Sequence, residues 1–274
     1  MYPANTQSKF SDWYEKTNFD HLEWEGWNLP KSGQQNADCG KWAWRGCLNH
    51  TGHADGGIRA QTFQLCCFRS SCPVCSDRWA KRSTARMMDR LTHSKKNLKY
   101  LKHVVVSPPR WLQNKPIEEL RKEARKMAKR AGIQGGLDIV HPFRQRDGKW
   151  YLSPHFHYLA LGWVSKTDEI FQKNGWLVKN IGIRDNPVGT IAYLLSHAGI
   201  KKRRHTVTWF GDLSYSKLKI EKLEFKVKCP DCDGDFQRLV CFKDGLSVKP
   251  PPIAFEFSDD HQGWKYWLDH VRGY

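Results

Sequence analysis

The chain has 274 residues, of which 39% are hydrophobic and 13% aromatic, so it can bury a sizeable core. Its formal net charge of +17, from 45 Lys and Arg against 28 Asp and Glu, indicates a polyanionic partner, with nucleic acid favoured over an anionic membrane. No apolar run approaches the length of about 18 residues that a membrane span needs, and residues 1–20 lack the apolar segment of a signal peptide. We therefore expect a cytoplasmic protein with no membrane partner.

The cysteine pattern predicts bound zinc. Six of the nine cysteines lie between residues 39 and 75 in close groups, which suits metal binding in a reducing compartment better than disulfide bonds. In the segment Cys72-Pro-Val-Cys75, both thiolates can reach one tetrahedral ion. The expected ligands of this structural zinc site are Cys47, Cys67, Cys72 and Cys75. His50 and Cys39 are alternatives to Cys47.

The next elements alternate between helix and strand. An amphipathic, basic helix is predicted over 77–91, and a strand over 101–107 that ends at two prolines. A helix follows over 116–131, with Gly132 as its stop. The residues expected on its inward face are Ile117, Leu120, Ala124, Met127 and Ala131. Residues 136–141 predict another strand, and Asp147-Gly148 predicts a hairpin turn.

The strand after that turn, 153–161, carries two histidines. It begins with a proline near its start and ends at Gly162. Side chains two positions apart share a face of a strand, so His155 and His157 point the same way. Two imidazoles on one face can hold one divalent metal ion. The sequence therefore predicts a metal site on this strand.

A third ligand has to come from the neighbouring strand of the hairpin, where Asp138 and His141 are the candidates. With a simple two-residue loop at 147–148, Asp138 stands opposite His157 and shares its face, while His141 points away. Pro142 cannot donate to a strand ladder, and a bulge there would reverse the facing of every residue before it. Both candidates stay open on this reasoning.

Residues 185–199 predict a helix with a proline in its first turn and a glycine at its end. A core stripe is expected at Val188, Ile191, Leu195 and Ala198. A neighbouring polar stripe consists of Asn186, Thr190, Tyr193 and His197. This arrangement presents a tyrosine hydroxyl beside a histidine.

Pro154-His-Phe-His-Tyr-Leu159 resembles the His-hydrophobic-His motif of the HUH endonucleases, which initiate rolling-circle replication of plasmids and viruses. The segment Cys67–Trp79 resembles the Cys-Pro-x-Cys segment of plasmid and archaeal-virus Rep proteins, and His141-Pro-Phe-Arg144 resembles the archaeal form of the third-ligand region. The likeness implies an α+β fold with a central antiparallel sheet and helices, as in RNA-recognition-motif folds. It also implies His141 as the third ligand.

In a family member of this type, Tyr193 is the single catalytic nucleophile, and His141, His155 and His157 bind Mn²⁺ or Mg²⁺. The resemblance implies nicking of one DNA strand to give a 5'-phosphotyrosine and a free 3'-hydroxyl, with later rejoining. His197 would orient or deprotonate Tyr193, or act as a fourth metal donor. Many relatives have a lysine or a second tyrosine near this position, and this chain departs from that pattern.

The tail contains a second cysteine group, Cys229, Cys232 and Cys241, which is either a second zinc site or a metal-free hairpin. Strands over 205–210 and 219–228 and a short helix over 261–272 are expected. The expected division is 1–95 for the zinc module and basic helix, 96–225 for the endonuclease core, and 226–274 for the cysteine hairpin and aromatic helix.

The expected partners follow from this interpretation. The substrate is single-stranded or cruciform origin DNA, and the absence of a phosphate-binding loop means that a host helicase and a host polymerase are needed. Two alternatives stay open. One is an HUH transposase or relaxase, and the other is a zinc-dependent nucleic-acid-binding protein without catalytic activity.

Overall fold

The computed structural model describes residues 24–94, 96–220, 228–243, 246–248 and 270–273. The chain divides into two compact units, a first unit of Met1–Gln34 and Arg69–Glu221 and a second unit of Gln35–Phe68 and Lys222–Tyr274. Within the described residues, every strand pair in both sheets is antiparallel. Helices accompany these sheets, so the predicted α+β class is confirmed.

The first unit contains a five-stranded sheet with the strand order β6-β3-β5-β4-β7. Its strands are β3 (Lys102–Ser107), β4 (Ile133–Arg146), β5 (Lys149–Gly162), β6 (Leu177–Ile183) and β7 (Val207–Gly211). β4 and β5 form a long hairpin, whose turn has positive φ angles of 51° at Asp147 and 76° at Gly148. Two consecutive positive φ angles are typical of a two-residue hairpin loop, so the predicted turn is confirmed.

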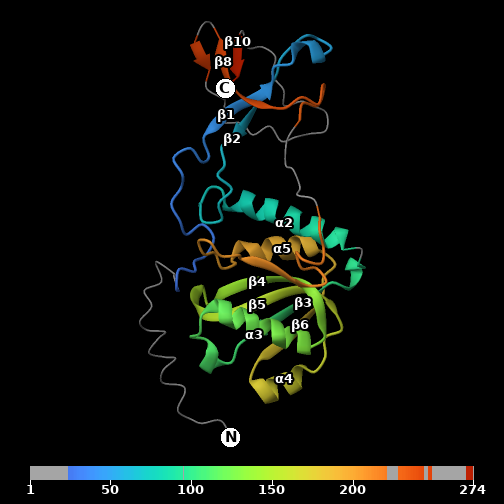
Figure 1. The fold of residues 1–274 in the computed structure, drawn as a ribbon. Helices are drawn as coiled ribbons and strands as arrows, with labels where there is room; N and C mark the ends of the chain where they lie inside the picture. The colour runs from blue at the N-terminus through green and yellow to red at the C-terminus, as the bar shows by residue number, and fades with distance from the viewer. Residues whose placement is uncertain (1–23, 95, 221–227, 244–245, 249–269, 274) are drawn as a thin grey trace. The chain divides into compact units, whose positions relative to one another are not determined.

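Helix α3 (Ile117–Arg130) covers one face of this sheet (Figure 1). Its buried residues and its C-cap repeat at helical spacing and match the predicted inward face: Ile117, Leu120, Ala124, Met127 and Ala131. They belong to one core cluster together with the strand residues Val104, Val140 and Phe156. Burial of this apolar stripe stabilises the helix, because its other faces carry mostly Lys, Arg and Glu.

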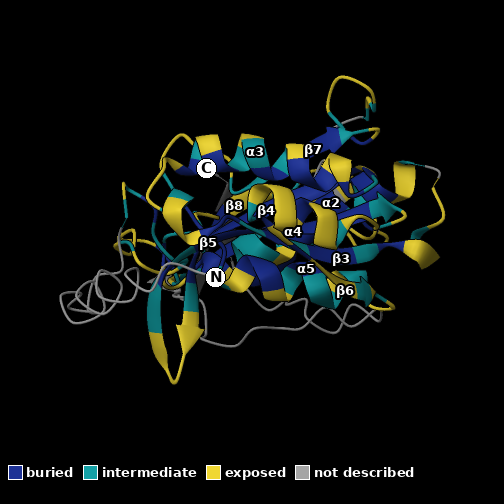
Figure 2. Cartoon of the chain, turned by 90° about the horizontal axis from the view of Figure 1, so that it is seen from below, coloured by how far each residue is buried: buried dark blue, intermediate teal, exposed yellow. Residues whose placement is uncertain are grey.

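Helices α2 (Ser76–His93) and α5 (Pro187–Ser196) cover the opposite face. Figure 2 shows the buried strands between α3 and α5. Leu91 of α2 and Ile191 of α5 share a core cluster with Ile139 and Leu159 of the sheet. The predicted core position Val188 is wrong, because its side chain is 50% exposed, and Leu194 is fully buried instead.

In the first unit, one helix and one strand were not expected from the sequence: α4 (Thr167–Asn174) and the edge strand β6. Most β6 residues are exposed or only half-buried, so the strand has no apolar alternation that could reveal it. Three short 3₁₀ turns complete the described elements: η1 (His50–Gly52), η2 (Leu98–Tyr100) and η3 (Arg110–Leu112).

The second unit combines two distant parts of the chain in one sheet of order β10-β8-β1-β2, with β9 paired to β8. Its strands are β1 (Trp42–Cys47), β2 (Arg59–Gln64), β8 (Gln237–Lys243), β9 (Leu246–Val248) and β10 (His270–Gly273). The helix predicted over 261–272 is wrong at its end, where β10 lies, and 261–269 fall outside the described residues. Most of the strand predicted over 219–228 falls outside them as well.

No helix within the described ranges combines the length and the hydropathy that a bilayer crossing requires.

Candidate active site

Strand β5 presents His155 and His157 on the sheet face that α2 and α5 cover. His157 lies opposite Ile139 of β4, and Ile139 packs in the cluster on that face. Phe156 points the other way, into the cluster beneath α3. The two imidazole ring centres are 4.9 Å apart. The alternation of a pleated strand therefore places both rings side by side, as the sequence predicts.

A bulge in β5, opposite Pro142 of β4, brings His141 to the same face. Below the bulge Phe143 pairs with Leu152, and above it His141 pairs with His155, so the register shifts by one residue between the two pairs. Two β5 residues, Ser153 and Pro154, lie opposite the single β4 residue Pro142, and neither proline can contribute an amide to the ladder. His141, His155 and His157 form a group whose ring nitrogens lie within 4.8 Å of one another and could hold a metal ion.

The same shift places Asp138 on the opposite face, where it pairs with Tyr158 across the hairpin. Its fully buried carboxylate contacts the guanidinium groups of Arg121 and Arg125 of α3 and accepts a 2.9 Å hydrogen bond from Thr208. The structure therefore gives Asp138 a neutralising role under α3. The pairing expected from a two-residue loop alone, which makes Asp138 the neighbour of His157, is therefore not the pairing observed.

The donor nitrogens of two of these histidines can be assigned from their partners. Nε2 of His141 lies 3.0 Å from the carbonyl oxygen of Leu194, which can only accept, so Nε2 carries the proton. Nδ1 of His141 is buried and has no hydrogen-bond partner among the described residues. Nδ1 of His155 donates to the carbonyl of Ser153 at 2.8 Å, which leaves its Nε2 as the bare nitrogen. Hydrogen bonding of the second ring nitrogen is the usual way in which a metal-binding histidine is oriented.

His157 is oriented by a fourth histidine, His103 of β3. Nε2 of His103 lies 2.7 Å from Nδ1 of His157, and Nδ1 of His103 lies 3.2 Å from a guanidinium nitrogen of Arg184. Sequence reasoning assigned no chemistry to the strand that carries His103. An isolated histidine in a Val-rich strand gives no sign of a partner that is 54 residues away.

Burial keeps these histidines neutral. Desolvation lowers the pKa of His155 to about 3 and that of His103 to about 4. It also lowers the pKa of His141 and His157 well below the ordinary value, with a further contribution from the neighbouring rings. A neutral imidazole is the form that binds a metal ion.

Tyr193 of α5 lies on the same face as the histidine group, and its side chain is 67% exposed. The ring of His197, the C-cap residue of α5, lies 4.7 Å from the ring of Tyr193 and 4.5 Å from that of His141. His197 therefore contacts both the candidate nucleophile and a candidate ligand. The ring of Trp150 of β5 lies 6.3 Å from that of His197, which adds an aromatic surface that the sequence analysis did not single out.

Seven of the eight cysteines that the structure describes fall into two groups. Cys39, Cys67, Cys72 and Cys75 form a group that could hold a metal ion, so the alternative Cys39 takes the position that was expected for Cys47. Cys47 instead belongs to a group with His53, Cys229 and Cys232. The side chains of His50 and Cys241 lie outside the described part of the chain.

Comparisons with protein-family models, with curated proteins and with solved structures found no match to this chain.

Proposed function

We propose that this protein is a metal-dependent HUH-type endonuclease that nicks one DNA strand at a replication origin and can rejoin it. The observation that carries the proposal is the group of His141, His155 and His157 on the sheet face beneath α5, together with Tyr193 on that helix. A β-bulge is needed to complete the group, and bulges are frequent beside active sites. The sheet order and the helices on both faces also suit this fold.

The donor set fits a divalent transition metal. Each histidine is neutral, and His141 and His155 each keep one bare ring nitrogen as a ligand atom, with the ring of His157 beside them. Imidazole suits softer ions, whereas Mg²⁺ prefers oxygen ligands, so Mn²⁺ is favoured over Mg²⁺ at this site. The ion would supply charge withdrawal from the phosphate oxygens.

The proposed reaction is a transesterification. The Tyr193 hydroxyl loses its proton and its oxygen bonds to phosphorus, while the bond from phosphorus to the 3'-oxygen breaks and that oxygen takes up a proton. The products are a 5'-phosphotyrosine and a 3'-hydroxyl that can prime synthesis. His197 is placed to orient the phenol or to accept its proton, because its ring contacts the Tyr193 ring. Exposure of Tyr193 leaves it open to a DNA strand.

Two further features suit DNA. The charge of +17 attracts phosphates, and exposed aromatic side chains such as Trp111 and Trp163 offer stacking surfaces for bases. The HUH transposases and relaxases use the same chemistry. The initiator assignment rests on the metal motif preceding the tyrosine and on the cysteine-rich segment before the core.

The test uses a random single-stranded DNA library labelled at its 3' end, incubated with the protein and Mn²⁺. Catalysis transfers the label to the protein as a band that survives SDS, because the 5'-phosphate of the labelled fragment is attached to Tyr193. Tyr193→Phe and chelation with EDTA should each reduce this band below detection. Tyr215→Phe is the matched control, because Tyr215 is similarly exposed at 62% and its ring stacking against Arg90 is kept by phenylalanine.

Labelling of the Tyr193→Phe protein at the wild-type level would contradict the proposed nucleophile. If every variant binds the DNA and SDS then removes all of it, the protein binds DNA without catalytic activity.

A further inference from the structure

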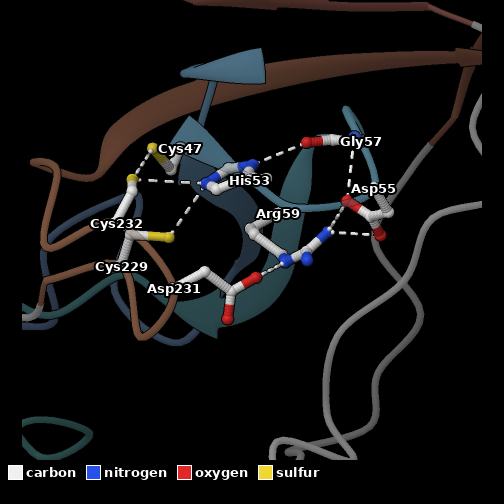
Figure 3. Close-up of polar contacts among 8 residues, drawn as sticks. All are labelled: Cys47, His53, Asp55, Gly57, Arg59, Cys229, Asp231 and Cys232. Carbon is white, nitrogen blue, oxygen red and sulfur yellow. Dashed lines mark hydrogen bonds and ion pairs between the residues drawn. The ribbon is translucent and has the colours of Figure 1, made fainter. Parts of the chain in front are cut away.

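The second unit contains a four-residue donor group that the endonuclease chemistry does not use. Cys47 ends β1, His53 lies in the connection between β1 and β2, and Cys229 and Cys232 lie in the turn before β8 (Figure 3). Their ligand atoms all lie within 4.8 Å of one another, although the two parts of the chain are more than 170 residues apart.

The spacing of the four donors matches a tetrahedral zinc site. Zinc–sulfur bonds of about 2.3 Å and zinc–nitrogen bonds of about 2.0 Å place tetrahedral donors roughly 3.5 to 3.8 Å apart. In this group, Sγ of Cys47 lies 3.6 Å from Sγ of Cys232. Nε2 of His53 lies 3.2 Å from Sγ of Cys229 and 3.3 Å from Sγ of Cys232. All four donors therefore converge on one point.

The outer contacts hold His53 in the tautomer that a metal needs. Nδ1 of His53 donates to the carbonyl oxygen of Gly57 at 2.6 Å, so the bare nitrogen is Nε2, which faces the thiols. The amide of Gly57 donates in turn to the carboxylate of Asp55 at 3.0 Å. Arg59 joins Asp55 to Asp231, which lies between the two cysteines of the turn.

The two thiols pack closely against the chain at Gly234. A Cβ there would lie 3.1 Å from Sγ of Cys47 and 3.2 Å from Sγ of Cys232. The amide of Cys229 donates to the carbonyl of Gly234, and the amide of Asp233 donates to that of Cys229, both at 2.9 Å. This tight turn presents both thiols of Cys229-Pro-Asp-Cys232 to the same side.

The described core of the second unit is small. Its core cluster of buried residues, within the described part of the chain, consists of Trp44, Ala60 and Leu239. A core of this size stabilises a small domain weakly, and structural metal ions commonly supply the remainder.

We propose that Cys47, His53, Cys229 and Cys232 bind a structural zinc ion that joins the β1–β2 hairpin to the C-terminal strands of the second unit. With four protein ligands, this site has no open position for a substrate, as is typical of structural zinc. The proposal is independent of the nuclease reaction and of the ligands of the first unit.

The test measures zinc bound to the purified full-length chain by mass spectrometry of the metal. His53→Ala and Cys229→Ser should each contain one equivalent of zinc less than the wild type. Cys66→Ser is the matched control, because Cys66 belongs to the second unit but to neither of the two cysteine groups, and it should keep the wild-type content. His53→Cys should retain the equivalent, and with Co²⁺ its absorption should change to that of a four-thiolate site.

A second measurement uses only the wild-type protein, so it does not depend on whether a variant folds. Removal of zinc from the wild type should raise hydrogen exchange in residues 228–235 and in β8, while β4 and β5 keep their protection. Unchanged zinc content in both His53→Ala and Cys229→Ser would overturn the proposal. Detection of a Cys47–Cys232 disulfide in the purified protein would overturn it as well.

Discussion

Asp138 and His141 lie three residues apart on β4, and both side chains are fully buried, yet they serve different purposes. Asp138 neutralises Arg121 and Arg125 under α3, whereas His141 joins the histidine group on the other face. A buried carboxylate is tolerated only with charged or hydrogen-bonding partners, and here those partners come from α3 and β7. Burial alone therefore does not identify a metal ligand at this position.

Asp138→Asn is expected to destabilise the protein by about 3 to 5 kcal/mol, because it leaves two arginines beside a buried neutral amide. Urea unfolding followed by circular dichroism measures this loss. Metal affinity of the first unit, measured by calorimetry with Mn²⁺, should stay within a few-fold of the wild type. The control is Asp147→Asn at the exposed hairpin turn, which should leave the unfolding midpoint unchanged.

Loss of Mn²⁺ binding in Asp138→Asn at unchanged stability would show that this carboxylate, and not His141, is the third ligand.

At the scale of elements, the C-terminal end of α5 is joined to β4 beside the bulge. The carbonyl of Leu194, one of the last in the helix, accepts from His141, and the amide of Gly199 donates to the carbonyl of Val140 at 2.7 Å. These contacts satisfy backbone groups that a helix end leaves open. They also hold the helix that carries Tyr193 against the strand that carries His141.

Gly199→Ala tests this contact, because a Cβ at Gly199 would lie 2.5 Å from Cδ of Pro142. The rigid proline ring cannot move aside, so we expect a loss of about 1 to 3 kcal/mol in stability. We also expect slower formation of the protein–DNA adduct at temperatures where the protein stays folded. Val188→Ala is the control on the same helix, since Val188 is half exposed, and it should behave as the wild type.

If Gly199→Ala forms the adduct at the wild-type rate and has the wild-type stability, neither property depends on the close contact between the helix end and the bulge.

At the scale of the whole molecule, the dominant feature is the charge of +17. Carboxylates such as Asp138, Asp55 and Asp231 are engaged with arginines inside their own units. Much of the remaining positive charge is available for an outside polyanion. For a protein of this charge, attraction to phosphates and release of their counterions contribute a large part of nucleic-acid affinity.

The affinity for single-stranded DNA should therefore fall steeply with salt. The logarithm of the association constant is expected to decrease linearly with the logarithm of the salt concentration, by about 0.7 for each phosphate contacted. Fluorescence anisotropy with a labelled oligonucleotide measures this slope, with the Tyr193→Phe variant used because it lacks the proposed nucleophile. An affinity that is independent of salt would contradict a phosphate-based interface.

Much of the first unit could be predicted from sequence because its signals are local. The apolar spacing of Ile117 to Ala131 indicated the buried face of α3, and Asp147-Gly148 indicated the hairpin turn. The pleat of β5 placed His155 and His157 side by side. Strand β6 and the partner of His157, His103, could not be predicted, because an exposed edge strand has no apolar pattern and a lone histidine has no local signature.

The sequence by itself determined which residue types were available as ligands and which neighbours share a face, since both follow from chain geometry over a few residues. Only the tertiary structure showed that His141, and not Asp138, shares the face of His155 and His157, because one extra residue in β5 opposite Pro142 shifts the register of the two strands. It also decided that Cys47 is grouped with His53, Cys229 and Cys232. A ligand set depends on distances in space, and the pairing of strands more than 190 residues apart is not encoded in the spacing of cysteines along the chain.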